Sequence, residues 1–158
     1  MATLTAARAA STFPVAKTIG GGVMHAYYGS YTLAANPTVA DIIQFCRVPA
    51  GCTVVGGVLM GPDIDTNATE TFDLDIGWAD NGVDVADPDG FGNFGVMQGD
   101  VITELLPVAG IWKPLQGVLL VSGPVTFAAE TIIQGVVNAV AATGGTGTLS
   151  LVVYGVNP

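Results

Sequence analysis

The sequence predicts an all-β protein: an antiparallel β-sandwich of jelly-roll type with an extended N-terminal arm and at most one short helix. Three observations predict this fold class. Apolar and polar residues alternate with a period of two in several segments, Gly-Pro and Pro-Ala-Gly turn signals end these segments, and strand patterns do not alternate with helix patterns. The 158 residues are 50% hydrophobic, which is enough for one core, so we expect a single domain.

The first half of the chain divides into an arm and a series of strands. We expect residues 1–22 to form the arm and residues 23–158 the sandwich. The segments of the first half that have strand patterns are 23–33, 39–48, 53–60 and 71–78. In TFDLDIGW, the last of these, four apolar side chains point one way while Asp73 and Asp75 point the other. This alternation predicts a strand with one core side and one solvated side, followed by a long acidic surface loop.

The second half of the chain contains three more predicted strands and one short helix. The strand segments are 117–122, 131–142 and 148–156. Residues 143–147, TGGTG, form a flexible loop that suits a hairpin between the last two strands. The apolar residues of 131–142 would also line one face of a helix, but the β-branched residues and Gly135 favour a strand. We accept a short helix over 100–106, which begins with an aspartate and is followed by a proline.

The charge balance limits the partners of the protein. Four basic residues stand against thirteen acidic ones, a net charge of −9, so we do not expect nucleic acid as a partner. The longest uncharged segment, 131–158, is interrupted by polar residues and glycines, so we expect no membrane span. Arg8 and Lys17 are half of the basic residues, and no acidic residue precedes Asp41. The arm is therefore either a solvated terminus or a segment that lies on an acidic or polar partner surface.

Residues that could support catalysis are few. The single histidine, His25, lies among aromatic residues in a predicted strand, where we expect a packing role. Cys46 and Cys52 flank RVPAG and lack a nearby histidine, so a zinc site is not indicated. We expect two buried thiols, with a disulfide as the alternative. No nucleophile elbow or phosphate loop accompanies these residues, and we therefore expect no enzyme activity and no cofactor.

The loop aspartates allow a structural and a metal-binding interpretation. Asp63, Asp65 and Asn67 match the first ligand positions of a calcium loop, but the expected glycine and closing glutamate are missing from their places. The carboxylates of the following Pro/Gly loop could also gather a hard cation, and they are weak metal candidates: Asp84, Asp87 and Asp89. The ordinary turn-forming role of aspartate accounts for both groups without a metal, and we favour it.

The pair Asp73 and Asp75 raises a separate question. The rise of a strand places alternate residues roughly 7 Å apart, a spacing that is compatible with two glycosidase carboxylates. No other feature of the sequence indicates a sugar-binding cleft. A small hydrolase is therefore only a third hypothesis.

Residues 40–84 contain a pattern of strands and turns that resembles a known family. The pattern is D-x-I at the start of one strand, R-x-P-A-G-x-x-V at the turn into the next, and T-x-x-L-D-I-G after an acidic loop. The matching residues are Asp41, Ile42, Ile43, Arg47, Pro49, Ala50, Gly51, Val54, Thr71, Leu74, Asp75, Ile76 and Gly77. This block resembles small structural proteins of tailed bacteriophages that are often found among head genes, and the C-terminal GTLSLVVYGVNP is similar to their closing strand.

The resemblance implies a capsid decoration or cement protein. Such a protein would have a jelly-roll-like body, form a homotrimer, and bind the major capsid protein on the outer surface of the virion. The arm, with Arg8, Phe13 and Lys17, would then reach along the capsid. Four aromatic residues are candidates for the oligomer interface, although they could equally fill the core: Tyr27, Tyr28, Tyr31 and Trp112. The alternative hypothesis is a calcium-dependent host-surface or carbohydrate-binding module of a phage fibre or tail.

Overall fold

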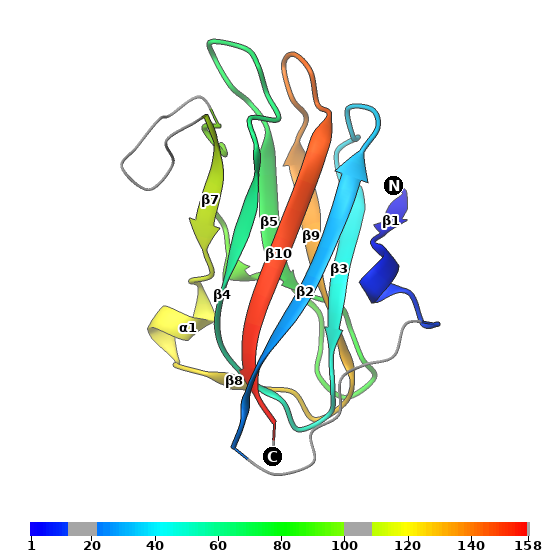
Figure 1. Cartoon of the computed structure of the whole chain (residues 1–158), viewed down its shortest axis with the longest axis vertical. Coiled ribbons are helices and arrows are strands. Elements are labelled where there is room, and N and C mark those ends of the chain that lie inside the picture. The colour runs from blue at the N-terminus through cyan, green and yellow to red at the C-terminus, as the bar shows by residue number, and fades with distance from the viewer. Residues whose placement is uncertain (13–21, 100–108, 158) are drawn as a thin grey trace.

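The computed structural model describes residues 1–12, 22–99 and 109–157, and it shows two β-sheets packed face to face (Figure 1). The first sheet, called the β3 sheet here, consists of β1 (Thr3–Thr5), β3 (Ile42–Val48), β9 (Thr131–Ala139), β5 (Asp73–Trp78) and β6 (Asp87–Gly92), in that order. The second, the β2 sheet, consists of β2 (Met24–Leu33), β10 (Gly147–Val156), β4 (Thr53–Pro62) and β7 (Gly110–Pro114), with β8 (Val125–Thr126) paired to β4. The two helices are η1 (Ala7–Ala9) and α1 (Val118–Val121).

The order of the strands is that of a jelly roll. Consecutive strands β2, β3, β4 and β5 alternate between the two sheets, β10 lies between β2 and β4, and β9 lies between β3 and β5. Apart from the parallel pair β1 and β3, all strand pairs are antiparallel. This interleaving of two Greek keys is the jelly-roll arrangement. The predicted fold class, an all-β sandwich with at most one short α-helix, is confirmed in the described residues.

Six predicted strands are present, with small shifts at their ends. Four of them correspond to β2, β4, β5 and β10: segments 23–33, 53–60, 71–78 and 148–156. The fifth, 39–48, corresponds to β3, but the strand begins only at Ile42. The ambiguous segment 131–142 is strand β9 and not a helix. Within β9, Gly135 lies against the side chain of Leu74, where an added Cβ would be 2.9 Å from a Leu74 methyl carbon. The glycine that disfavoured a helix is thus required by packing between neighbouring strands.

Several local predictions are wrong. The segment 117–122 forms helix α1 instead of a strand; Gly117 and Gly123 have positive φ angles on either side of it, and none of its four residues is buried. The loop 143–147 does not close a hairpin, because β9 and β10 belong to different sheets. Asp87 and Asp89 lie on edge strand β6 and not in a loop. The predicted helix over 100–106 lies outside the described residues.

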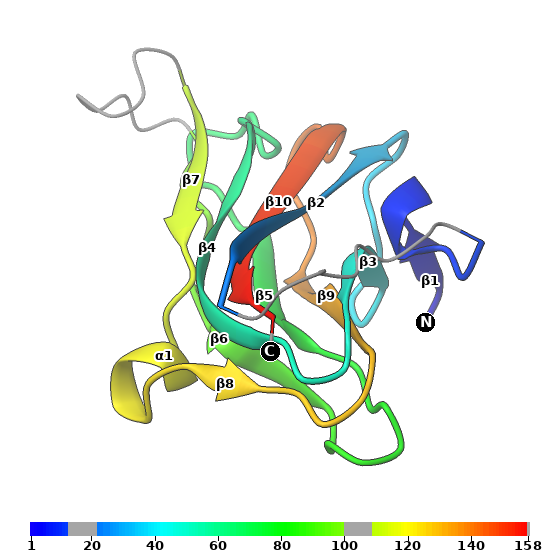
Figure 2. The same ribbon diagram turned by 60° about the horizontal axis from the view of Figure 1, so that its bottom comes forward.

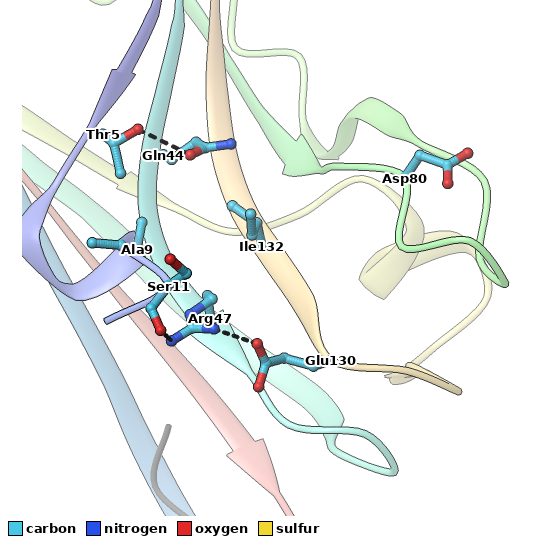
Figure 3. A pocket seen from close by; sticks show the side chains of 9 residues that line it. Thr5, Ala9, Ser11, Gln44, Arg47, Asp80, Glu130 and Ile132 are labelled. Atoms are coloured by element: carbon cyan, nitrogen blue, oxygen red, sulfur yellow. Dashed lines mark hydrogen bonds and ion pairs between the residues drawn. The ribbon is translucent and has the colours of Figure 1, made fainter. Parts of the chain in front are cut away.

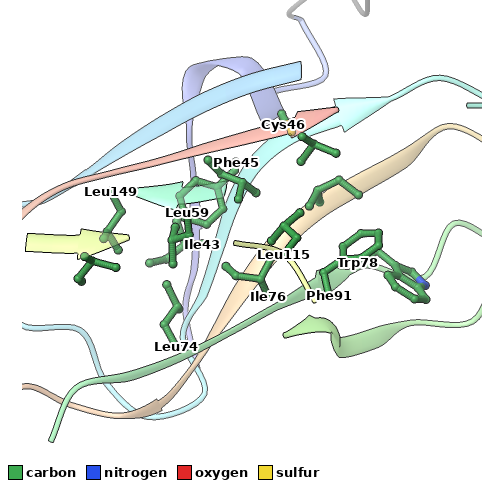
Figure 4. Packing of buried hydrophobic residues seen from close by; sticks show 14 of the residues in the cluster. Ile43, Phe45, Cys46, Leu59, Leu74, Ile76, Trp78, Phe91, Leu115 and Leu149 are labelled. Carbon is green, nitrogen blue, oxygen red and sulfur yellow. The ribbon is translucent and has the colours of Figure 1, made fainter. Parts of the chain in front are cut away.

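The core fills the space between the two sheets (Figure 4). Phe45, on β3, is fully buried, and burying such a side chain contributes roughly 1.5–3 kcal/mol. At the end of the sandwich near α1 and β8 (Figure 2), Trp78, Phe91 and Phe127 form a cluster with ring centroids 4.9–6.3 Å apart. Where β2 crosses β3, a Cβ on Gly29 would lie 1.9 Å from the Phe45 carbonyl oxygen, so this close approach requires glycine.

The first part of the predicted arm lies against the sandwich. Strand β1 extends the β3 sheet, and the Ala2 backbone N–H donates to Asp41 at 2.7 Å. Helix η1 contacts both β2 and β3, and its last residue, Ala9, and the preceding Ala6 are buried, so it covers the opening between the sheets on this side. Phe13 and Lys17 lie outside the described residues, and Arg8 lies on η1. Within residues 1–12, 22–99 and 109–157, the structure contains no helix long and apolar enough to span a membrane.

Candidate functional surfaces

The outer side of the β2 sheet carries no charged side chain. In β10 the buried residues Leu149, Leu151 and Val153 alternate with more exposed ones, and the strand register extends this alternation to β2, β4 and β7. The outward residues, called the uncharged face here, are Met24, Ala26, Tyr28, Ser30, Thr32, Gly56, Met60, Trp112, Pro114, Thr148, Ser150, Val152, Tyr154 and Val156; Val58 has the same register but is buried. Lys113 is the single Lys, Arg, Asp or Glu of these four strands, and it pairs with buried Leu59, on the inner side.

Four of the six hydroxyl groups of the uncharged face are paired with one another across the strands. The Oγ1 atoms of Thr32 and Thr148 are 2.8 Å apart, and the Tyr28 hydroxyl is 3.2 Å from the Ser150 hydroxyl. Both contacts join β2 to β10. Cross-strand pairs of this kind stabilise a sheet, and they also satisfy polar groups without water. The face is therefore less polar than its serine and threonine content suggests.

The β3 sheet has a different edge, where β5 and β6 bring acidic residues together. Four carboxylates, called the acidic edge here, belong to these two strands: Asp73, Asp75, Asp87 and Asp89. Asp75 is 6% exposed and accepts a hydrogen bond from Asn138 at 2.5 Å, while its Oδ1 is buried without a partner. Burial raises the pKa of Asp75; the Asn138 bond opposes this shift, and the charges of Asp73 and Asp89 add to it.

The prediction that Asp75 points into solvent is therefore wrong. The alternation of TFDLDIGW correctly separates two sides of β5, but the outer side is covered at this position. Asp73 is half-buried, and burial raises its pKa as well. Burial also raises the pKa of Asp87, and neighbouring Asp89 raises it further. The charged forms of Asp73, Asp75 and Asp87 are thus disfavoured.

A shallow depression of about 460 Å³ lies where the N-terminal segment meets β3 and β9 (Figure 3). At its centre Arg47 forms an ion pair with Glu130 and donates to the Ser11 carbonyl oxygen at 3.4 Å. Thr5 donates to the Gln44 side chain at 3.0 Å beside it. These contacts join residues 1–12 to the body, and the geometry indicates an attachment point for the N-terminal segment.

The loop aspartates are used by the backbone. Asp65 is 1% exposed and accepts hydrogen bonds from five backbone N–H groups. Asp84 accepts from the Asn81 side chain at 2.8 Å and from the Ala128 N–H at 2.9 Å, which joins the 79–86 loop to the segment before β9. No group of three or more His, Cys, Asp or Glu in the described part of the chain could hold a metal ion. The weak metal candidates Asp84, Asp87 and Asp89 are thus not brought together as a ligand set.

The predicted interface aromatics lie in different places. Tyr27 is 5% exposed and its hydroxyl donates to Asn157 Oδ1 at 2.6 Å, so its assignment to an interface is corrected: it belongs to the core. Tyr31 is half-buried and packs against the core. Tyr28 and Trp112 do lie on the surface, both on the uncharged face. Tyr154, on the same face, was missed, although the alternation of GTLSLVVYGV would have placed it opposite the buried residues.

The residues considered for catalysis are held as core or core-adjacent groups. His25 is half-buried on β2, with its ring centroid 6.3 Å from that of Tyr27. Cys46 and Cys52 are both buried and do not form a disulfide. Burial raises the pKa of the Cys52 thiol, with the Tyr27 hydrogen bond opposing the shift, and burial raises the pKa of Tyr27 to about 12. A neutral buried thiol is the opposite of an activated nucleophile.

Comparison with known proteins identifies the fold among phage capsids. No family model and no curated protein matches the chain. Among solved structures, a chain of the cyanophage Pam1 capsid asymmetric unit is similar over 94% of this chain and 95% of its own, with 26% identity and a TM-score of 0.64. A chain of the capsid of Ralstonia phage GP4 is similar over 99% of both chains, with 16% identity and a TM-score of 0.73.

A third structure extends this comparison. A chain of the acidic stable capsid of Helicobacter pylori bacteriophage KHP30 has 14% identity and a TM-score of 0.56, over 88% of this chain and 91% of its own. The similarities at 16% and 14% identity concern the fold alone. The Pam1 match, at 26% identity, supports a virion structural role and a relation to phage capsids.

Proposed function

We propose that this protein is a capsid decoration, or cement, protein of a tailed bacteriophage. In this role it binds the assembled lattice of the major capsid protein on the outer surface of the virion, as a homotrimer, and stabilises the head. The observation that carries the proposal is the similarity to a phage capsid chain over 94% of this chain and 95% of that one. The similarity therefore includes the whole sandwich and not an isolated motif.

Stabilisation of the capsid by this protein would require binding only and no catalysed reaction. A protein that binds the assembled lattice more tightly than dispersed subunits stabilises the shell by that difference in affinity. The buried state of Cys46 and Cys52 and the packing of His25 beside Tyr27 are consistent with a protein whose work is binding. We assign the N-terminal arm, with Arg8, Phe13 and Lys17, to contact with the lattice, because its positive charge is separated from the acidic remainder of the chain.

The direct test is binding to capsids of the phage that encodes the protein. Purified protein should bind expanded capsids saturably, bind dispersed major capsid protein much more weakly, and raise the temperature at which the capsids disassemble. Absence of binding to expanded capsids at both low and moderate salt would refute the proposed function.

The arm can be tested without disturbing β1. The double variant Arg8→Glu/Lys17→Glu should bind capsids at least about tenfold more weakly, since each reversed charge loses an attraction and adds a repulsion. Lys113→Glu, which changes a basic residue on β7, is the matched control and should bind as the wild type does. If the arm variant bound capsids as tightly as the wild type, the charges of the arm would not contribute to capsid binding.

The alternative of a calcium-dependent host-surface or carbohydrate-binding module has a separate test. Backbone N–H groups occupy both oxygens of Asp65, and Asn81 and Ala128 occupy Oδ2 of Asp84, which leaves few oxygens for a calcium ion. Calorimetric titration with millimolar calcium should therefore show no heat of binding. A saturable signal that Asp84→Asn abolishes would favour this alternative.

A further inference from the structure

The uncharged face is unusual for a chain with a net charge of −9. Two copies of such a chain repel each other, and the repulsion is strongest when acidic surfaces meet. The acidic edge carries four carboxylates within β5 and β6. The outward residues of β2, β10, β4 and β7 include none, although these strands form half of the sandwich. Contact through the uncharged face therefore brings no like charges together.

The side chains of the uncharged face have the composition of a protein interface. Tyr28 and Tyr154 are each 40% exposed and Trp112 is 42% exposed. They lie on three different strands, β2, β10 and β7, so the aromatic surface crosses the whole width of the sheet. Tyrosine and tryptophan are enriched where proteins bind each other, and the burial of large aromatic rings supplies much of the binding energy.

Covering this face would also leave few polar groups without partners. The side-chain pairs Thr32 with Thr148 and Tyr28 with Ser150 already satisfy their hydroxyls across the strands. Desolvation of unpaired polar groups is the main cost of burying a polar surface. The face can therefore lose water at lower cost than a surface of unpaired serines and threonines.

The size of the face limits how much of a subunit contact it can supply. Four strands about 4.8 Å apart and up to ten residues long, at about 3.3 Å per residue, give an area of roughly 600 Å² before the relief of the side chains is counted. A stable interface buries about 800 Å² on each partner. In a ring of three, where each copy uses different halves of the face against its two neighbours, the face supplies about 300 Å² per partner in each contact, and adjoining surface supplies the rest.

We propose that the uncharged face is the surface through which copies of this chain associate. The number of copies rests on the proposed function, in which the assembly is a trimer. In a ring of three, each contact is between different halves of the same face, so the β2 half of one copy meets the β7 half of the next. Tyr28 and Trp112, on these opposite edges, then come from two neighbouring copies, and Tyr154 lies between them toward the axis.

The test compares an acidic substitution on this face with one on the other sheet. Tyr154→Asp places a charge on β10, the strand between β2 and β4, whereas Val140→Asp places the same charge just after β9, at a residue that is also exposed. Light scattering and sedimentation should show an oligomer for the wild type and for Val140→Asp. Tyr154→Asp should weaken association by about 100-fold or more, because a charge would be desolvated without a partner. Trp112→Asp should do the same, and circular dichroism should show that each variant remains folded.

The outcomes separate this inference from the proposed function. Monomeric wild-type protein at high micromolar concentration, or an oligomer that both Tyr154→Asp and Trp112→Asp leave intact, would overturn the inference. If these variants stay oligomeric but lose binding to capsids, the face contacts the lattice, and the proposed function stands without the inference. If they dissociate while the wild-type oligomer fails to bind any capsid, the inference stands and the proposed function fails.

Discussion

Asp65, in the loop between β4 and β5, and Asp75, on the acidic edge, are both buried aspartates. They differ in the groups that surround the carboxylate. Both oxygens of Asp65 accept hydrogen bonds from backbone N–H groups, whereas one oxygen of Asp75 is buried without a partner and has Asp73 and Asp89 nearby. Burial alone would raise the pKa of Asp65, but hydrogen bonds from the backbone outweigh it and hold the pKa far below its usual range. The pKa of Asp75 is raised.

The difference teaches that burial alone does not determine what a carboxylate does for a fold. A carboxylate with enough donors joins chain segments together, because each donor would otherwise be left unsatisfied. A carboxylate without them is a source of instability that the surrounding structure tolerates. The aspartates of this chain can be arranged between these two extremes, and substitutions measure where each one lies.

The largest effect is expected at Asp65. Asp65→Ala leaves the backbone N–H groups of residues 67, 71, 72, 142 and 143 without their acceptor and should lower the free energy of unfolding by about 3 kcal/mol or more. Asp65→Asn should be nearly as damaging, because its amide group would face N–H donors. Urea unfolding measures both. If Asp65→Ala lowered the free energy of unfolding by less than about 1 kcal/mol, water would be replacing the carboxylate as acceptor. Asp65 would then not stabilise the fold in the way that sets it apart from Asp75.

A smaller effect is expected at Asp84, whose carboxylate is more exposed to solvent. It accepts from Asn81 and Ala128, and the hydrogen bond from Asn81 is the main cause of its lowered pKa. Asp84→Ala should cost about 1 kcal/mol, because water can replace part of what is lost. Asp80→Ala is the control and should cost less, because the Asp80 carboxylate is exposed and accepts a hydrogen bond from the Gly82 N–H within its own turn. If the two variants lost the same free energy of unfolding, the hydrogen bond from Ala128 to Asp84 would add no stability beyond that of a local turn.

The sign of the effect should reverse at Asp75. Because its folded pKa is raised, the charged form destabilises the fold at neutral pH, and this destabilisation is relieved as pH falls through the folded pKa toward about 4. Asp75→Asn removes the charge and should raise the melting temperature at pH 7.5. The gain should be smaller at pH 4.5 than at pH 7.5, because a raised pKa means that the wild-type carboxyl takes up its proton earlier as the pH falls. Thermal unfolding by circular dichroism at both pH values measures it.

The opposite result at Asp75 would be equally informative. A variant that is less stable than the wild type at pH 7.5 would show that the carboxylate makes a favourable contact there. If that loss appeared only in the presence of calcium, the acidic edge would be a cation site, and the calcium-dependent alternative would gain support. Asp65→Asn, measured in the same buffers, shows whether the calcium effect is confined to the acidic edge.

The contrast between the aspartates also explains how far the sequence could predict the molecule. The sequence patterns correctly predicted β2, β4, β5 and β10. In β10 burial on one side leaves a period of two, whereas β5 keeps its apolar–acidic alternation although both of its sides are largely buried. The patterns did not predict β6, whose sequence DPDGFG has no alternation and whose pairing is determined by its neighbour β5. They also could not show that β9 and β10 belong to different sheets, since local sequence does not specify the sheet that a strand joins.

Which aromatic side chains lie on the surface also depends on long-range strand pairing, which local sequence does not specify. Tyr28 and Trp112 were selected by residue type, but Tyr27 and Tyr28 could be separated only by the register of β2 against β10. The roles of Asp65 and Asp75 were hidden for a related reason: two donors to Asp65 come from Ala142 and Thr143, which are 77 and 78 residues away in the chain. Long-range hydrogen bonds decide whether a buried aspartate stabilises the fold, and no local pattern encodes them.

The smallest effect on stability is expected at Glu130, an exposed residue, in contrast to the buried Asp65 and Asp75. The side chain of Glu130 is 46% exposed, while that of its partner Arg47 is 12% exposed. Exposed ion pairs contribute about 0–1 kcal/mol, so Glu130→Gln should change the free energy of unfolding by less than about 1 kcal/mol, and the change should decrease as salt screens the pair. A larger loss that persists in high salt would mean that Arg47, half enclosed between β3 and the N-terminal segment, depends on this carboxylate as the backbone amides depend on Asp65. In that case β1 should also exchange its amide hydrogens faster in Glu130→Gln, because the attachment of residues 1–12 would be weakened.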